Sequence, residues 1–539
     1  MKSKVLLVIV LSFVLLTFNL GSWGVTETSE SRYAEISHEM LVKHDYIHPY
    51  LLDIHHYHKP PLTYLITTLG YDLFGVNEFG ARFFLQIAIL IQLILVYNIA
   101  LLFYKKKKIA FSAMLIYFSF PIVIISSRNL TTDAYLTTTV LASIFFWLYY
   151  KLRASKPIFI YLFFISLGLS FEIKGPVGLI FPFVFIMSHR LITKEKLKIT
   201  THHIIGFILF LAVSLAWYVI VFIENPMLYN YFFKEQIVNR ISSKSYNRSK
   251  PFWFYLLTLP AIGLPWIFFL CHQTYKGFKN IKNQKSYSLI LIWTISTIII
   301  LFSAFKTKLI LYILPSFGFL AILTAKLLSQ TSPKTLKKYN LIIISFIGLI
   351  ASSLIVLSII DFKFNYSLIT AIIISLLVSI FIVLVLKNNK GLLRTSILGY
   401  LLGAFLLTSG TQFLKLNDSE LNSTREVFKF INTKLPQKEN IVVYNYLIAS
   451  SQFYSDKKVY ILNDGHNTVQ RETQFETSTN WKDYNFNLHN ENGINKAKNI
   501  LNKNAVLITR KKHDIQEHNK YLKRNLPNRK EIGTWVIYY

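Results

Sequence analysis

The chain alternates long apolar runs with short polar connections, beginning near residue 5 and ending near residue 413. As a helix, a run of about 18 or more residues is long enough to cross the roughly 30 Å hydrocarbon core of a lipid bilayer. Backbone groups inside lipid must form their hydrogen bonds within the spanning segment, so these runs are expected to be α-helices. We predict thirteen spans, near residues 5–20, 83–104, 109–126, 133–150, 157–171, 175–188, 203–223, 252–271, 286–302, 309–325, 340–360, 366–386 and 395–413.

Composition indicates the same class of protein. Of the 539 residues, 53% are hydrophobic and only 16% are charged, and the mean hydropathy is +0.41. A soluble domain is less apolar than this, so we expect a polytopic α-helical membrane protein. The single cysteine, Cys271, excludes a disulfide framework and a cysteine-based metal site. The first run follows Lys2 and Lys4 and, taken alone, also resembles a secretory signal peptide.

Basic residues gather in the connections on one side of the membrane. With the N-terminus inside, the connections after the even-numbered spans carry 22 basic residues and a single acid, Glu195. This bias follows the positive-inside rule and therefore orients the chain. The formal net charge of +31 could also indicate nucleic-acid binding. The charges are, however, dispersed over six short loops and form no single basic face, so no nucleic-acid partner is expected.

An odd number of spans places residues 414–539 on the outer side, where the composition changes. Strand-like runs alternate there with helical stretches at 423–435 and 513–526. We therefore predict a transmembrane domain at 1–413 and a soluble α/β domain at 414–539. The strand-like runs lie at 440–445, 457–464, 504–509 and 533–539.

The polar residues that could carry chemistry fall in the outer loops. The longest of these loops, 21–82, has stretches of helical period that are too polar or too short to span, and these are expected to lie along the membrane interface. Its charged and titratable residues include Glu27, Glu30, Arg32, Glu35, His38, His44, His48, His55, His56, His58 and Lys59. The other outer loops contribute Arg128, Asp133, Glu172, Lys174, Glu235, Gln236, Arg240, Lys306 and Lys308.

Cations and acids together at the edge of the lipid suit a substrate that is an amphiphilic phosphate. Lysine and arginine bind phosphate oxygens, and a carboxylate can orient or deprotonate an acceptor hydroxyl. This combination favours group transfer from a lipid phosphate. Structural alternatives remain open: the lysines could snorkel, Asp133 could cap a helix, and Arg32 could pair with Glu35. Tyr33 and Tyr57 lie in an aromatic-rich loop, and such loops are more often interfacial belts than sugar-binding surfaces.

Several motifs resemble one known family. The stretches "ESRYAEISHEML", "HYHKPPLTYLI" and "LFGVNEFGARF" are similar to the first outer loop of the bacterial aminoarabinose (lipid A) transferase and protein O-mannosyltransferase superfamily. "IKGPVGL" and "SAFKTKLILYILP" resemble later motifs of that family, in the same order. The resemblance implies a GT-C fold, a polyprenyl-phosphate sugar donor and transfer on the outer face, usually with inversion at the sugar carbon.

The resemblance also implies roles for individual residues. The arginine and acid of the first motif correspond to Arg32 and Glu30, but Ser29 stands where the family has an aspartate. Either Glu30 or the nearby Glu27 would then be the catalytic acid, or the acceptor needs none. The lysine that lies against the donor phosphate corresponds to Lys59.

Further positions carry over in the same way. The outer-loop aspartate corresponds to Asp133, which would position the sugar or the acceptor. The family's glutamate before the phosphate lysine can join a later histidine in holding a metal. Here these positions hold His58 and Gln236, of which histidine is a good zinc ligand and glutamine a poor one. A divalent metal, zinc or magnesium or manganese, held by His58 with His55 or His56 is one alternative to a solvated histidine loop.

The predicted function is transfer of a sugar from an undecaprenyl-phosphate-type donor to lipid A, another envelope lipid or glycan, or a protein. The predicted setting is the periplasmic face of a bacterial inner membrane. A transporter or lipid-linked sugar flippase is the alternative, although it would place ionisable residues within the spans. The candidates are Glu30, Glu27 and Asp133 for catalysis, Arg32, Lys59, Lys306 and Lys308 for the donor phosphate, Tyr33, Tyr57 and Arg240 for the substrate, and His58 for a metal.

Overall fold

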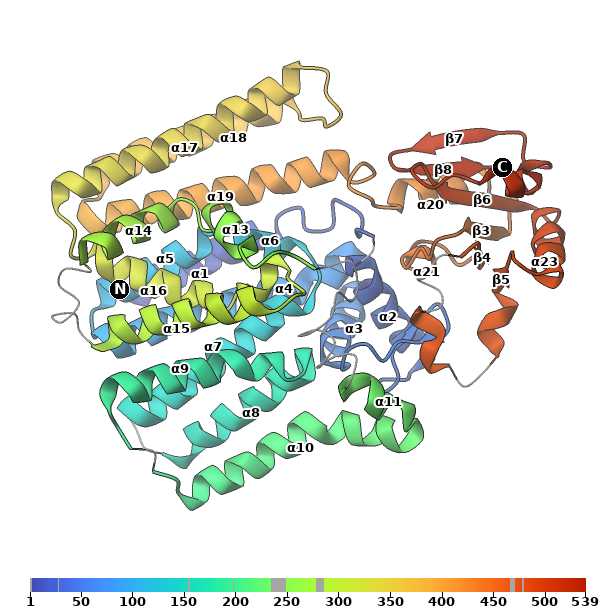
Figure 1. Ribbon diagram of the computed structural model, residues 1–539. Coiled ribbons are helices and arrows are strands. Elements are labelled where there is room, and N and C mark those ends of the chain that lie inside the picture. Colours follow the sequence, from blue (N-terminus) through green and yellow to red (C-terminus); the bar gives the residue numbers. More distant parts are fainter. Residues whose placement is uncertain are drawn as a thin grey trace. The chain divides into compact units, whose positions relative to one another are not determined.

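The chain forms two compact units, each assembled from two stretches of sequence (Figure 1). The first comprises Met1–Phe18 and Leu85–Gln412, and the second comprises Asn19–Phe84 and Phe413–Tyr539. The segment 21–82, predicted as an outer loop of the membrane domain, thus groups with the C-terminal part. The computed structural model describes residues 2–27, 29–153, 156–196, 198–233, 249–277, 286–465, 471–476 and 479–539.

The first unit is helical, as its apolar runs predict. Its helix α4 (Glu78–Tyr104) begins in the second unit, and its last helix, α19 (Gly391–Asn417), ends there. The other helices are α1 (Lys2–Thr17), α5 (Lys107–Phe118), α6 (Pro121–Arg128), α7 (Thr132–Leu152), α8 (Pro157–Lys174), α9 (Val177–Thr193), α10 (Thr201–Glu224), α11 (Met227–Asn230), α13 (Phe254–Ile262), α14 (Trp266–Gly277), α15 (Ser286–Ala304), η4 (Ile310–Ile313), α16 (Ser316–Leu328), α17 (Pro333–Ile359) and α18 (Leu368–Asn388).

In the part of the chain that the structure describes, seven helices are long and apolar enough to cross a membrane. These are α4, α8, α10, α15, α17, α18 and α19, and the number rises to nine if each of two bent pairs is one span. The bent pairs are α5 with α6, at 57°, and α13 with α14, at 113°. Helices α1, α7, α9 and α16 occupy the remaining expected segments. A multi-pass membrane protein is therefore confirmed, whereas the count of thirteen crossings stays a prediction.

Prolines explain where the two bent pairs break. Pro121 is the first residue of α6, and a proline disfavours helical backbone in the residue before it. Pro265 lies in the break between α13 and α14, directly before Trp266. Each pair is therefore two helices instead of one straight span.

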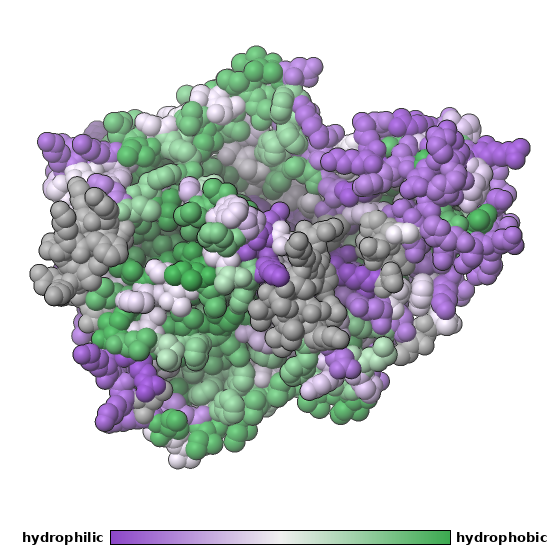
Figure 2. Space-filling model, in the orientation of Figure 1, coloured by the Kyte–Doolittle hydropathy of each residue, from purple (hydrophilic) through white to green (hydrophobic). Residues whose placement is uncertain are grey.

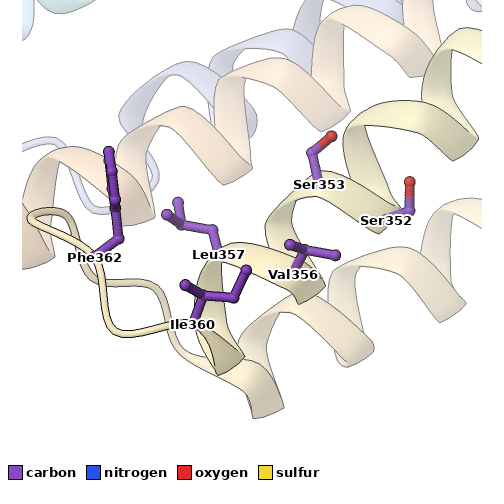
Figure 3. Close-up of a pocket in the computed structure, with 6 residues that line it drawn as sticks. All are labelled: Ser352, Ser353, Val356, Leu357, Ile360 and Phe362. Atoms are coloured by element: carbon purple, nitrogen blue, oxygen red, sulfur yellow. The ribbon is translucent and has the colours of Figure 1, made fainter.

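Helices α17 and α18 expose apolar side chains along their length, as a lipid-facing hairpin would. Leu341, Leu349 and Ile369 are 64%, 61% and 71% exposed. Figure 2 shows such hydrophobic residues gathered over the helical unit. A shallow hollow of about 330 Å³ lies on this hairpin (Figure 3), and it has no titratable group among its lining residues, which are Ser352, Ser353, Val356, Leu357, Ile360 and Phe362.

The C-terminal part of the second unit is built on a six-stranded mixed sheet in the order β5-β4-β3-β6-β8-β7. Strands β3 to β6 pair in parallel, and β8 is antiparallel to both β6 and β7. The strands are β3 (Asn440–Tyr444), β4 (Lys458–Asn463), β5 (Asn485–Asn487), β6 (Ala505–Arg510), β7 (Arg529–Ile532) and β8 (Trp535–Tyr538).

Alternating side chains of the central strands bury both faces of this sheet. On β3, Val442 joins the cluster that contains α23 (Glu491–Leu501), while Ile441 and Val443 join the cluster that contains α20 (Arg425–Lys434). This is the α/β layering expected of a sheet that is covered on both sides. The sheet unit also contains α21 (Ser451–Tyr454), η5 (Thr473–Phe475), η6 (Asn480–Asp483) and η7 (Glu517–Lys523).

Most of this domain agrees with the sequence pattern. The four predicted strands are confirmed as β3, β4, β6 and β8, and the helical stretch at 423–435 contains α20. The stretch at 513–526 instead contains a 3-10 helix, η7, over Glu517–Lys523. Strands β5 and β7 are not among the predicted strands, because "NFN" and "RKEI" are too short and polar to show a strand pattern.

The N-terminal part of the second unit consists of α2 (Ser29–Lys43), the hairpin strands β1 (Tyr50–Leu51) and β2 (Ile54–His55), and α3 (Leu62–Phe74). The Tyr71 hydroxyl on α3 donates to the carbonyl of Ala34 on α2 at 3.0 Å. This segment shares a buried core with the sheet domain. That core contains Ile36, Met40, Leu51, Tyr64, Leu447, Ala449 and Ile461.

Candidate functional site

A tight hairpin fixes the start of the histidine-rich segment. Strands β1 and β2 are joined by Leu52 and Asp53, both with positive φ (54° and 62°), as a two-residue type I′ turn requires. The Glu39 carboxylate on α2 accepts hydrogen bonds from both of their backbone N–H groups. Residues 56–59 therefore leave the hairpin from a point that is held against α2.

Four side chains from three segments meet directly after this hairpin. His56 Nδ1 lies 2.8 Å and His58 Nε2 lies 3.3 Å from Oε2 of Glu472. The other oxygen of Glu472 lies 3.1 Å from an Arg32 guanidinium nitrogen. The two histidines and Glu472 are buried. The structure thus brings together two predicted residues, Arg32 and His58, through an acid from the C-terminal domain.

Burial controls the protonation of this cluster. It lowers the pKa of His56, and it lowers the pKa of His58 to about 3, so both imidazoles are neutral at pH 7. Burial by itself would raise the pKa of Glu472, but His56 and Arg32 outweigh it and hold that pKa well below its ordinary value. The cluster is therefore a buried carboxylate that faces two neutral imidazoles and one guanidinium.

Glu30, a predicted catalytic acid, lies in the first turn of α2 and is bound on both oxygens. Arg82 Nε is 2.7 Å from Oε1, and Arg82 Nη2 is 2.9 Å from Oε2. The same Oε2 accepts from the backbone N–H of Thr26 at 3.0 Å. Arg82 also lies over the ring of Trp23, with 4.1 Å to the ring centroid. Acting as a base would require Glu30 to loosen this arrangement.

Glu27, the other candidate acid, is held by the C-terminal domain. Its carboxylate accepts hydrogen bonds from the backbone N–H groups of Ala449 and Ser450, at 3.2 and 3.0 Å, and from the Ser450 hydroxyl at 2.6 Å. Glu27 is buried, and this burial raises its pKa despite the hydrogen bonds. Glu27 therefore links the first loop to the C-terminal domain, whereas Glu30 links parts of the first loop to one another.

Lys59, the predicted phosphate lysine, follows His58 and precedes α3. It is half-buried, and Pro60 and Pro61 lie between it and the first residue of that helix. The predicted sugar-contacting tyrosines are packed. Tyr57 stacks on His55 at 5.4 Å between ring centroids, and Tyr33 lies 5.4 Å from Tyr64.

A second group of polar residues lies in the helical unit. Asp133, at the start of α7, forms a buried ion pair with Lys174 at the end of α8. The Lys174 ammonium also lies over the ring of Tyr312, 4.4 Å from the centroid. These three residues come from the three outer stretches at 127–135, 173–179 and 303–315. The structure therefore brings the family-like motifs of the helical unit to one place.

The remaining candidates are less tightly gathered. Lys308 is buried and donates to the backbone carbonyl of Lys250 at 2.8 Å, whereas Lys306 is exposed. Arg240 and Gln236 lie outside the described residues.

Three residues that matter to these groups are not among the predicted site residues. Arg82 and Lys174 fall inside the family-like motifs "LFGVNEFGARF" and "IKGPVGL", which could have marked them. Glu472 lies 416 residues after His56 in the chain. No local pattern in the sequence connects those two residues, so only the folded chain shows that they meet.

Comparison with known proteins finds similarity to sugar transferases over part of the chain. Residues 1–230 match the model of the dolichyl-phosphate-mannose-protein mannosyltransferase family. The chain is 31% identical over 347 residues to the undecaprenyl phosphate-alpha-4-amino-4-deoxy-L-arabinose arabinosyl transferase of Photorhabdus laumondii, covering 63% of each protein. It is 30% identical over 329 residues to the second such transferase of Proteus mirabilis, covering 60% of this chain and 59% of that one. The chain therefore matches less than two thirds of the length of these relatives.

The fold likeness extends over the whole chain. The crystal structure of ArnT from Cupriavidus metallidurans, bound to undecaprenyl phosphate, matches 100% of this chain and 98% of its own, with a TM-score of 0.78 and 18% sequence identity. The fold implied by the motifs is thus confirmed: the chain is a multi-pass membrane protein with a GT-C fold. The chain shares the fold of ArnT from the first helix to the C-terminal sheet.

Proposed function

We propose that this protein transfers a sugar from a polyprenyl-phosphate donor to an acceptor at the outer face of the membrane. The observation that carries the proposal is the similarity to arabinosyl transferases over more than 300 residues, combined with the ArnT fold over the full chain. The same similarity favours a transferase over a transporter or flippase. The proposed acceptor is lipid A, another envelope lipid or glycan, or a protein.

In the proposed reaction, an acceptor oxygen forms a bond to the anomeric carbon of the sugar. The bond from that carbon to the phosphate oxygen breaks, and polyprenyl phosphate leaves with its electron pair. Cations stabilise the negative charge that develops on this leaving group. Lys59 and Arg32, with Lys306 or Lys308, are proposed for this role.

The hydrogen bonds of the two candidate acids, Glu30 and Glu27, help to define the chemical kind of acceptor. Glu30 and Glu27 are both occupied by strong hydrogen bonds within the second unit. An acceptor hydroxyl would need one of them as a base, whereas a phosphate acceptor is already ionised and would need none. The arrangement therefore supports an acceptor with a phosphate group, which also agrees with Ser29 in place of the family's aspartate.

The proposed location is a bacterial inner membrane, with the site and the C-terminal domain on the periplasmic side. The support is the charge bias of the connections, which places 22 basic residues and one acid on the opposite side. A cysteine-accessibility experiment tests this directly. Single cysteines at exposed Lys429 in α20 and at exposed Lys107 would react with a membrane-impermeant reagent only at residue 429.

Mass spectrometry of envelope lipids, glycans and proteins tests the transfer itself. Cells with and without the chain are compared, and polyprenyl-phosphate sugars are quantified in the same extracts. Loss of one sugar from a product, with accumulation of its lipid donor, is the expected result. Movement of the lipid-linked sugar across the membrane without cleavage of its phosphate bond would contradict the proposal and support a flippase.

A further inference from the structure

Four polar side chains of the C-terminal domain gather where the parallel strands of its sheet end. Tyr444 is the last residue of β3, Asp464 follows β4, His489 follows β5, and His518 lies in η7 after β6. Ligands of open α/β sheets commonly bind outside the carboxyl ends of the strands. We propose that Asp464, His489 and His518 bind a divalent cation of the zinc class at this edge. The proposal goes beyond sugar transfer, for which none of these three residues is a candidate.

Asp464 is oriented as a cation ligand would be. Its side chain is only 3% exposed. One carboxylate oxygen, Oδ2, accepts a hydrogen bond from the Tyr444 hydroxyl at 2.5 Å and another from Asn519 Nδ2 at 2.9 Å. Both donors are neutral, so they fix the carboxylate and leave its negative charge to be balanced from the other side. Ligating carboxylates are commonly held by such outer hydrogen bonds.

Two imidazoles face the other oxygen of Asp464. His518 Nε2 lies 3.5 Å and His489 Nε2 lies 3.7 Å from Oδ1. Zinc bonds of about 2.0–2.1 Å in a tetrahedron place neighbouring ligand atoms roughly 3.3 Å apart, so each nitrogen is close to the required distance from Oδ1. To share one ion, the two imidazoles must also turn toward each other. The side chains of His489 and His518 are 62% and 61% exposed, which leaves room for that rotation.

The donor set suits zinc, because two imidazoles and one carboxylate are common zinc ligands and leave a fourth position for water or another ligand. The alternative is a hydrogen-bonded cluster without a metal, in which each histidine interacts separately with Asp464. The two possibilities differ in one measurable respect. A shared ion needs both imidazoles at once, whereas each hydrogen bond needs only its own imidazole.

Zinc binding to the purified full-length protein tests the site without a sugar donor or acceptor, so the result does not depend on the transfer reaction. The protein is stripped with a chelator, titrated with zinc and separated from free metal before elemental analysis. The double variant His489→Gln with His518→Gln is expected to bind one zinc ion per chain fewer than wild type. His513→Gln changes another exposed histidine of the same domain, so it should bind as many ions as wild type.

The difference between wild type and the double variant isolates the proposed site. Any metal held at His58, as the family resemblance implies, would be retained by both proteins and cancels in the comparison. Because His489 and His518 are exposed, their replacement should leave the melting temperature without zinc unchanged. Added zinc is expected to raise the melting temperature of wild type and of His513→Gln by more than that of the double variant.

Single variants test whether one ion is shared. His489→Gln and His518→Gln are each expected to weaken zinc binding at this site by more than the roughly 10–100-fold typical of outer-shell residues. Tyr444→Phe, which removes a hydroxyl that orients Asp464, is expected to fall within that range. Equal zinc content in wild type and the double variant would overturn the proposal and leave the hydrogen-bonded cluster. A single histidine variant that binds zinc as tightly as wild type would also overturn it.

Discussion

Arg82 and Glu30 form a buried two-point ion pair that joins the start of α4 to the first turn of α2. The distances are 2.7 Å from Arg82 Nε to Glu30 Oε1 and 2.9 Å from Arg82 Nη2 to Oε2, and both residues are at most 2% exposed. Arg82 also donates to the backbone carbonyls of Leu20, Trp23 and Gly24. A predicted catalytic acid is therefore also a central structural residue of the first loop.

Glu30→Gln is expected to destabilise the protein strongly, because it leaves the charge of Arg82 buried without its partner. Breaking a buried pair in this way typically costs about 3–5 kcal/mol. Thermal unfolding in detergent measures the loss, with Glu426→Gln on the exposed face of α20 as the control. Transfer activity per folded molecule separates the two roles. If it stays near wild type, Glu30 is not the catalytic acid.

The stability contribution of Glu27 should depend on pH. Burial raises the pKa of Glu27 above 4.5, so folding favours its protonated form. That contribution is fully present below about pH 4.5 and is lost as the pH rises through the folded pKa. Glu27→Gln cannot ionise. The melting temperature of wild type should therefore fall relative to that of Glu27→Gln between pH 5 and pH 8.

The quantity compared is the difference in melting temperature between wild type and Glu27→Gln. The effects of other titrating groups are the same in both proteins and therefore cancel. Glutamine also leaves one of its amide hydrogens facing the donors of Ala449 and Ser450, but this penalty does not change with pH. A constant difference in melting temperature across that range would show that Glu27 is ionised throughout. The carboxylate would then be stabilised by its hydrogen bonds more than it is penalised by burial.

Lys59→Ala should abolish transfer and leave the fold intact. Lys59 is half-buried beside the proline pair before α3, and it corresponds to the lysine expected to contact the donor phosphate. Lys59→Arg keeps the charge but changes a compact ammonium into a wide planar group, so partial activity is expected. Lys429→Ala, at an exposed position on α20, is the control. Activity of Lys59→Ala within a few-fold of wild type would exclude the phosphate role.

The fold could be predicted from the sequence because its two main patterns are local. Apolar runs of spanning length marked the helical segments, and β-branched runs such as that at 440–445 marked the four strands found in the sheet. The pattern failed where side chains carry little information, as in the three-residue strand β5. The pattern also separated 21–82 from the C-terminal domain, because their shared core, which contains Ile36 and Leu447, joins residues far apart in the chain.

The candidate site could be predicted only in part, because contacts between residues far apart in the chain leave no local pattern in the sequence. Motifs pointed to Arg32, Glu30, Asp133 and Lys59, since each lies within a recognisable stretch. They did not show that Glu30 is paired with Arg82. Nor did they show that Glu472 lies between the histidines and Arg32, because pairing is a property of the folded chain. Electrostatic partners decide which of these groups is available for chemistry.

The Asp133–Lys174 pair should act as one unit in transfer. It is buried, it joins Asp133 to the family-like stretch 173–179, and the Lys174 ammonium lies 4.4 Å from the ring centroid of Tyr312 in the family-like stretch 303–315. Asp133→Asn leaves the lysine charge without its partner, and Lys174→Gln leaves the carboxylate without its own. Each single change is therefore expected to lower kcat/KM at least about tenfold, the effect of 1.4 kcal/mol.

A double-mutant cycle on detergent-purified protein measures the coupling between the two residues. The double variant should be no worse than the poorer single variant, since residues that act as a unit are not additive. If the pair only supports the fold, the double variant would recover stability and activity together. If Lys174 also contacts the donor phosphate, stability would recover while kcat/KM stays low. Independent, additive losses in kcat/KM would contradict the assignment of Asp133 and Lys174 to one functional pair.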